Sequence, residues 1–213
     1  MSSTRTNFTV LMIGAAILMM GQGLLVTLLP VRGALEGLST TWIGYMGSAY
    51  YGGFAIGCLI GPGMIRNVGH IRVFAGFAAL TAAATLLFEL LPSQWAWVAT
   101  RGFTGVCFAI LSMAIESWLN ELSNNKNRGR ILSVYIIVGN IMIASGQLML
   151  NLRDPASSTL FILGALMICI SLAPISLSTI TEPSAPPSAK LRIGALYKLS
   201  PVGFVGCLAF GLV

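Results

Sequence analysis

The 213-residue sequence is too apolar for a water-soluble domain, because 56% of its residues are hydrophobic and only 8% are charged, against roughly 25% charged in typical soluble domains. A net charge of +6 suggests a nucleic-acid partner in a soluble protein, but here nearly all of it lies between apolar segments, where basic residues set membrane orientation. Composition therefore excludes a soluble nucleic-acid-binding protein and predicts an all-α polytopic membrane protein.

In chain order, six apolar segments are long enough for a helix to cross the hydrocarbon core, which takes about twenty residues. They cover residues 8–30, 42–65, 73–91, 95–118, 131–150 and 159–180. A polar, proline-containing stretch follows, and the apolar residues after it would form only about 20 Å of helix. We therefore expect a six-helix transmembrane half at 1–180, a cytoplasmic linker at 181–200 and an incomplete seventh transmembrane helix at 201–213.

Basic residues between these segments are distributed unevenly. Two of them, Arg32 and Arg153, lie on one side of the membrane if each apolar segment crosses it once. The other basic residues outside the spans lie on the opposite side, with the N-terminus: Arg5, Arg66, Arg72, Lys126, Arg128, Arg130, Lys190, Arg192 and Lys198. The positive-inside rule then predicts a multi-pass protein of a plasma membrane, a bacterial inner membrane, with a cytoplasmic N-terminus. The first segment is too long for a signal peptide and should remain as a span.

The segment at 95–118 carries Arg101 near one end and Glu116 near the other. A cation inside a spanning helix costs on the order of 2.5–3.5 kcal/mol, so Arg101 should face protein or a water-filled cavity. Snorkelling or a structural ion pair is the alternative, since Arg101 lies only about 9 Å inside the predicted external end. Gly105 continues the same helix face, where another helix or a solute can approach closely.

Three amide side chains, Gln22, Asn140 and Gln147, lie at depths that allow one polar layer with Arg101. For Asn140 and Gln147 we prefer a plain interhelical hydrogen bond, worth about 0.6 kcal/mol on average in membranes.

Glycines recur every four residues in the second segment, at Gly53, Gly57 and Gly61. This spacing gives one smooth helix face and predicts close packing against another helix.

The sequence predicts no enzymatic chemistry. The four cysteines lie in apolar segments without a metal-binding spacing, so we expect neither a metal site nor a cofactor. An intramembrane serine protease needs a serine and a histidine within the bilayer, and His70, the only histidine, falls in a predicted cytoplasmic turn.

That turn, GPGMIRNVGHIR at residues 61–72, resembles the loop between helices two and three of the major facilitator superfamily, Gly-x-Leu-Ala-Asp-Arg-x-Gly-Arg-Arg. Gly61 opens this turn, Gly69 matches the second glycine of the pattern, and Arg72 lies among the basic positions that follow. Arg66 stands where the family has aspartate, and His70 replaces a basic residue. The sequence RGFTG at 101–105 is similar to the fourth-helix pattern, and GQGLLVTLLP at 21–30 to the first helix.

The resemblance implies a solute transporter of twelve helices in two halves, each half containing two inverted three-helix repeats. This chain corresponds to the N-terminal half. Its implied partners are the lipid bilayer, a small-molecule solute, and the missing C-terminal half or a second copy, with protons as a candidate coupling ion. Because helices one and four line the family's cavity, Gln22 and Arg101 are the preferred solute-binding residues. A non-transporting sensor or assembly subunit is the alternative.

The family's loop aspartate belongs to a charge cluster that closes the cytoplasmic gate. With Arg66 in its place, an acidic partner is required, and we expect Glu116 at the cytoplasmic end of the fourth helix to supply it. The alternative is that Arg66 only anchors the loop in anionic headgroups.

Overall fold

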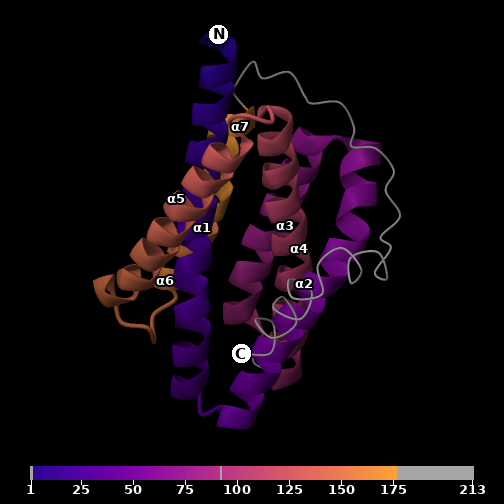
Figure 1. The fold of residues 1–213 in the computed structure, drawn as a ribbon. Coiled ribbons are helices and arrows are strands. Elements are labelled where there is room, and N and C mark those ends of the chain that lie inside the picture. The colour runs from indigo at the N-terminus through magenta and orange to yellow at the C-terminus, as the bar shows by residue number, and fades with distance from the viewer. Residues whose placement is uncertain (1, 92, 177–213) are drawn as a thin grey trace, which may run out of the picture.

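The computed structural model describes residues 2–91 and 93–176, with side chains from residue 7 onward. Helices run through almost all of this part of the chain (Figure 1). They are α1 (Ser2–Leu35), α2 (Thr40–Val68), α3 (His70–Leu90), α4 (Gln94–Glu121), α5 (Arg128–Leu148), the 3₁₀ turn η1 (Met149–Leu152), α6 (Thr159–Ile170) and α7 (Leu172–Ser176). The predicted linker at 181–200 and the predicted helix at 201–213 lie outside the described residues.

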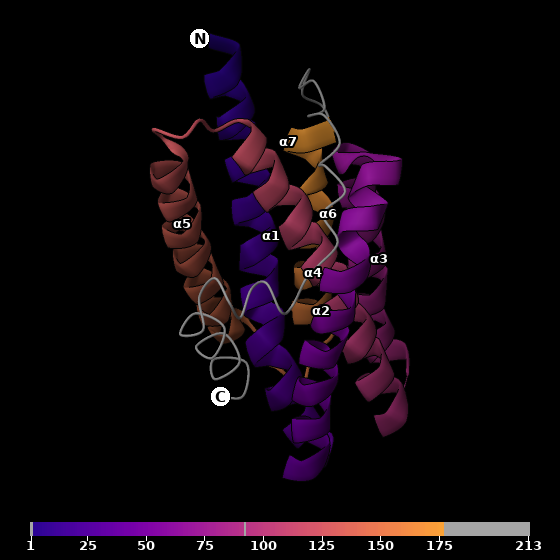
Figure 2. The same cartoon turned by 45° about the vertical axis from the view of Figure 1, so that its right-hand side comes forward.

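The helices form one bundle whose connections alternate between two ends (Figures 1 and 2). The first end, where α1 begins, also holds the α2–α3 turn, the α4–α5 loop and α7. The second end holds the α1–α2, α3–α4 and α5–α6 connections. The predicted all-helical bundle of six segments is therefore confirmed.

The sixth predicted span is interrupted between α6 and α7. Pro174 has no backbone N–H to donate to the carbonyl of Ile170, and its ring crowds that carbonyl. The helix therefore ends at Ile170 and resumes after Ser171, whose hydroxyl donates to the carbonyl of Ile168 at 2.6 Å.

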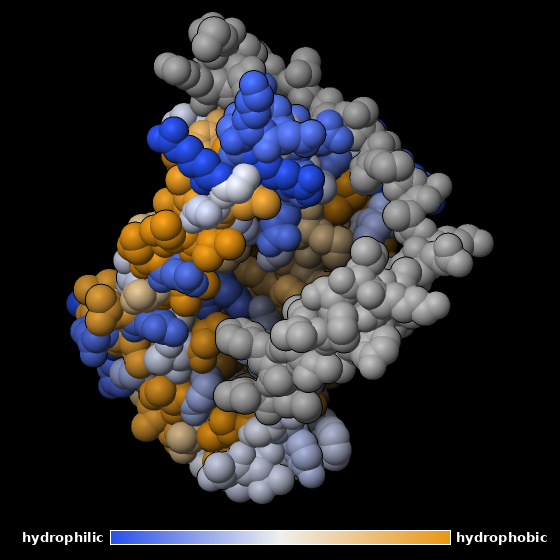
Figure 3. All heavy atoms as spheres, viewed as in Figure 1, coloured by the Kyte–Doolittle hydropathy of each residue, from blue (hydrophilic) through white to orange (hydrophobic). Residues whose placement is uncertain are grey.

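Five helical segments of the described chain are long and apolar enough to cross a membrane. They cover Asn7–Leu35, His70–Leu90, Gln94–Glu121, Arg128–Leu152 and Thr159–Ser176. Helix α2 has 29 residues and is long enough, but glycines and tyrosines lower its hydropathy. Figure 3 shows hydrophobic residues across the middle of one face, on the side of α5, and hydrophilic residues gathered at the first end.

Glycines allow α2 and α4 to pack backbone against backbone. A Cβ atom on Gly53 or Gly57 would collide with a backbone carbonyl of α4, and one on Gly105 would collide with the carbonyl of Tyr50. Helices α1 and α5 meet in the same way, because a Cβ on Gly23 would collide with a carbonyl of α5. Such close approach supplies the van der Waals contact that holds helices together in lipid.

The main contacts between helices correspond to one another when α1, α2 and α3 are exchanged with α4, α5 and α6. The extensive α2–α4 contact corresponds to α1–α5, the α3–α4 contact corresponds to α1–α6, and α3–α6 corresponds to itself. Helices α1 and α4 run in opposite directions through the bundle (Figure 1). The two three-helix units are therefore inverted repeats, as the resemblance to the superfamily implies.

Candidate functional site

A cavity of about 180 Å³ lies between α1, α2 and α4, toward the second end of the bundle. Helices α1 and α2 contribute mainly aliphatic side chains to its wall, and α2 adds Tyr50 and Tyr51. Arg101 of α4 also lines it and is the one charged residue among those that do. A mostly apolar pocket with a few converging polar groups is the usual form of a small-molecule site.

Close packing of α2 on α4 brings Tyr50 to Arg101. Because Gly105 has no side chain, the backbone of Tyr50 lies directly against it. Helices α2 and α4 both begin at the second end, and helical side chains lean toward the N-terminus of their helix. The Tyr50 ring therefore leans toward the preceding turn of α4, where the Arg101 guanidinium carbon lies 4.2 Å from the ring centroid.

Arg101 is only 7% exposed, and none of the ion pairs of the described residues involves it. The contact with Tyr50 is a cation–π interaction worth about 0.5–2 kcal/mol. That is less than the roughly 2.5–3.5 kcal/mol cost of placing the cation in a spanning helix. The guanidinium is thus held in place but incompletely compensated.

Gln22 of α1 extends this contact to a third helix. Its Nε2 donates to the Tyr50 hydroxyl at 2.6 Å, while its Oε1 is enclosed without a hydrogen-bond partner. If the amide is turned the other way, the free atom is the nitrogen instead. The residues thus form a chain across the bundle, from Gln22 through Tyr50 to Arg101. Gln22 and Arg101 are predicted from the sequence, but Tyr50 is not. The signal that could have identified Tyr50 is a phenol within an apolar span, because its hydroxyl needs a partner when it is buried.

The turn between α2 and α3 is a single glycine, Gly69, with φ of 96°. This conformation favours glycine and lets α3 begin immediately. His70 follows, 1% exposed, with Nε2 at 2.6 Å from the Ser117 hydroxyl of α4 and its ring beside Trp118. Gly61 lies earlier on the α2 face that meets α4, where a Cβ would be 3.2 Å from the Met113 side chain.

The family model of the Major Facilitator Superfamily matches residues 11–213. The chain belongs to the major facilitator superfamily. It is 26% identical to an uncharacterized MFS-type transporter of Enterobacter sp. (strain 638) over 217 residues, which cover 100% of this chain and 56% of that protein. It is also 26% identical to the uncharacterized MFS-type transporter YcaD of Escherichia coli O139:H28 over 215 residues, again 100% of this chain and 56% of the relative. The chain thus spans about half the length of these relatives.

The other motif residues of this superfamily member lie at the surface. Arg66, Arg72 and Glu116 are all exposed. The ion pairs of the described residues both involve Arg32, so the expected contact between Arg66 and Glu116 is not among them.

Asn140 and Gln147 of α5 do not join Gln22 and Arg101. Both are exposed, and neither lines the cavity. Seven residues apart, they share one face of α5, and that face is different from the one through which Gly146 packs on α1.

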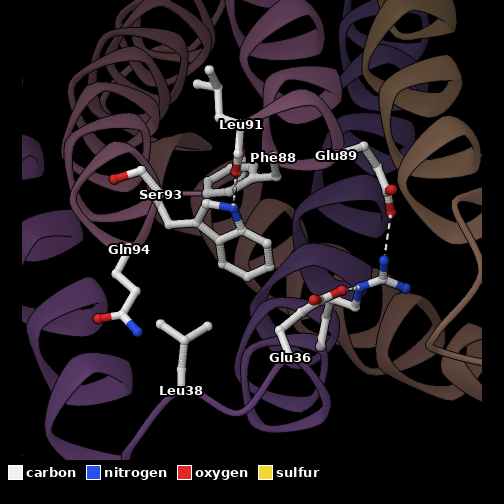
Figure 4. A pocket seen from close by; sticks show the side chains of 9 residues that line it. Glu36, Leu38, Phe88, Glu89, Leu91, Ser93 and Gln94 are labelled. Atoms are coloured by element: carbon white, nitrogen blue, oxygen red, sulfur yellow. Dashed lines mark hydrogen bonds and ion pairs between the residues drawn. The ribbon is translucent and has the colours of Figure 1, made fainter.

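A charge cluster at the second end was also missed. Arg32 pairs with Glu36 at 2.9 Å and with Glu89 of α3 at 3.6 Å, and donates to the carbonyls of Pro155 and its neighbour in the α5–α6 connection. The Ser158 hydroxyl donates to Glu89 at 3.0 Å. Of these residues, Arg32, Glu36 and Glu89 line a pocket of about 210 Å³ (Figure 4). The cluster ties together α1, α3 and the α5–α6 connection, which no local spacing in the sequence reveals.

Proposed function

We propose that this chain is the N-terminal half of a twelve-helix secondary transporter that moves a small solute across the membrane by alternating access. Membership of the superfamily supports the proposal, as do relatives named transporters that are nearly twice as long. The observation that carries it is Arg101, a buried cation on the wall of a cavity with no ion-pair partner among the described residues. Such a residue is costly in a membrane helix and usually marks a pathway for a solute or an ion.

The orientation belongs to the same proposal. Arg66, Arg72, Lys126, Arg128 and Arg130 lie at the first end of the bundle. By the positive-inside rule this end is cytoplasmic, so α1 begins in the cytoplasm and the cavity near Arg101 opens toward the outside. The bacterial sources of the relatives support a bacterial inner membrane as the location.

Uncovered helix faces support a second bundle that completes the protein. On α2, a Cβ on Gly44, Gly47 or Gly52 would meet no atom within 4 Å. On α5, Ile137 and Ile141 are more than half exposed beside Asn140 and Gln147. We propose that the C-terminal half of the same protein covers these faces, or a second copy in its place.

A transport role is favoured over an enzymatic one. His70 and Ser117 have the separation of a base and a nucleophile. The His70 ring, however, is 1% exposed and packed beside Trp118, so a substrate has no access to it. The alternative of a sensor or assembly subunit has no support from the relatives, which are named transporters.

Transport by reconstituted protein tests the proposal. The product of the complete gene is placed in vesicles, with and without a proton gradient, and solute accumulation is measured for a broad panel. We expect uptake of at least one solute class by that protein, its loss in Arg101→Gln, and no uptake by residues 1–213 alone. Arg153→Gln is the matched control, because Arg153 is exposed and its side chain forms one hydrogen bond within the described part of the chain, to the carbonyl of Leu152. Unchanged uptake in Arg101→Gln would contradict the proposed role of Arg101 in transport. Uptake by residues 1–213 alone would mean that a second copy replaces the C-terminal half.

A further inference from the structure

We infer that the solute of the α1–α2–α4 cavity is an organic anion with one acidic group and an apolar body, and that its acidic group binds the guanidinium of Arg101. This inference names the substrate class and rests on the transport function proposed above.

Arg101 has no acidic partner among the described residues. The chain has six acidic residues, and five of them lie in its described part: Glu36, Glu89, Glu116, Glu121 and Asp154. None of the five is within ion-pair distance of Arg101. A buried cation is stable only when it is paired and hydrogen-bonded. An anionic solute would supply both the charge and the acceptors.

The geometry of the Arg101 guanidinium also favours an anionic group. Tyr50 covers one face of this planar group, whereas the N–H donors point outward in the plane. The nitrogens of Arg101 are not among the fully enclosed unpaired atoms of the described chain, and the residue lines the cavity. The donor edge is therefore open to the cavity. A carboxylate fits that edge because it accepts two parallel hydrogen bonds from one guanidinium.

Gln22 keeps this donor edge fixed. It is 8% exposed and binds the Tyr50 hydroxyl, so the ring on which the guanidinium rests cannot turn freely. Gln22 is a positioning residue in this scheme. Its remaining unpaired amide atom is a second buried polar group without a partner, four residues before Val26 on the cavity wall.

The rest of the wall determines the remainder of the solute. Val26, Leu29, Ile43 and Met46 present aliphatic groups, and no other lining residue is charged. One cation balances one negative charge, and apolar walls favour an apolar body over water. Inorganic phosphate, with more charge and no apolar body, fits this wall poorly. The competing occupant is a carboxylate of the second half of the transporter, which would neutralise Arg101 without any solute.

Binding to the product of the complete gene in lipid nanodiscs decides between these occupants. The probes are straight-chain carboxylates from acetate to octanoate, and benzoate, each paired with its neutral amide, together with inorganic phosphate. We expect at least one carboxylate to bind about tenfold or more tightly than its amide, the factor typical of one charge-assisted interaction. Equal affinity for every carboxylate and its amide overturns the inference, as does tighter binding of phosphate than of any carboxylate.

Variants connect the preference to Arg101. Arg101→Gln should abolish the preference for carboxylate over amide, Arg101→Lys should keep a weaker one, and Arg153→Gln should leave it unchanged. A preference that survives in Arg101→Gln overturns the assignment. If Arg101→Gln does not fold, the comparison of carboxylate with amide in the unsubstituted protein and in Arg101→Lys still decides.

The inference and the transport proposal fail separately. Carboxylate binding through Arg101 without any uptake into vesicles would support the anion site and contradict the transport function. Uptake of a neutral solute that is unaffected by Arg101→Gln would support the transport function and contradict an anionic solute.

Discussion

The Arg101 guanidinium lies 4.2 Å from the centroid of the Tyr50 ring, and this contact joins α4 to α2 at the cavity wall. Tyr50 has a second contact at its other end, where its hydroxyl accepts a hydrogen bond from Gln22 of α1. One side chain thus connects three helices through two chemically different interactions. Substitutions can separate them, because phenylalanine keeps the ring and leucine removes it.

Tyr50→Leu should weaken binding of the best carboxylate probe by a factor of about 2–30, the equivalent of a cation–π contact worth about 0.5–2 kcal/mol. Tyr50→Phe should change that affinity by less than about threefold, since the ring remains under the guanidinium. It should lower the stability of the protein by roughly 1 kcal/mol, because Gln22 loses its hydrogen bond. Titration calorimetry and thermal unfolding in nanodiscs measure the two effects. Equal loss of affinity in both variants would contradict the role of the ring.

Adjacent glycines on α2 provide a matched test of helix packing. A Cβ on Gly53 would collide with the carbonyl of Gly102, whereas a Cβ on Gly52 would meet no atom within 4 Å. Gly53→Ala should therefore destabilise the bundle by about 1–3 kcal/mol, since overpacking against a backbone cannot relax by side-chain rotation. Both variants are made in residues 1–213 alone, because the face of Gly52 is one that we propose the C-terminal half covers. In this protein Gly52→Ala should be neutral or slightly stabilising, because alanine favours a helix by up to about 1 kcal/mol. Similar thermal stability of the two variants would show that the helix interface does not depend on Gly53.

The number and order of the transmembrane helices are predictable from the sequence, because hydropathy and loop charge are properties of continuous segments. The sequence also predicts that Arg101 faces protein or a water-filled cavity, since the cost of burying a cation depends little on which helix is its neighbour. The inverted repeat came from the resemblance to the superfamily, and the exchange-symmetric packing of α1–α3 and α4–α6 confirms it.

Contacts between distant segments were not predictable. Tyr50 becomes part of the site only because Gly105 lets α2 approach α4 and because Gln22 comes within reach from α1. Arg32 and Glu89 meet at the second end although no sequence pattern relates them. The break between α6 and α7 follows from Pro174, a signal present in the sequence but hidden within a uniformly apolar segment.

Arg32 should contribute substantially to the stability of the second end. Its side chain is 13% exposed, and it pairs with Glu36 and Glu89 while donating to carbonyls of the α5–α6 connection. Arg32→Gln should therefore cost about 1–3 kcal/mol, the range for losing hydrogen bonds of a charged group. Arg153→Gln, on the same side of the bundle, should stay within about 0.5 kcal/mol of the unsubstituted protein. Thermal unfolding in detergent measures both, and equal stability of all three proteins would contradict this role.

Substitutions of Arg66 and Glu116 test whether these two residues form the ion pair expected at the cytoplasmic gate. Both side chains are exposed, and they form no ion pair with each other in the described chain. We therefore predict that Arg66→Ala and Glu116→Gln change the free energy of unfolding additively, within about 0.5 kcal/mol, as independent sites do. The same cycle on Arg32→Gln and Glu89→Gln is the positive control, because those two side chains are largely buried and lie 3.6 Å apart. Coupling in the control and none between Arg66 and Glu116 would leave Arg66 as a headgroup anchor. Coupling above about 1 kcal/mol between Arg66 and Glu116, more than an exposed pair provides, would instead mean that the two side chains meet in a conformation in which the contact is buried.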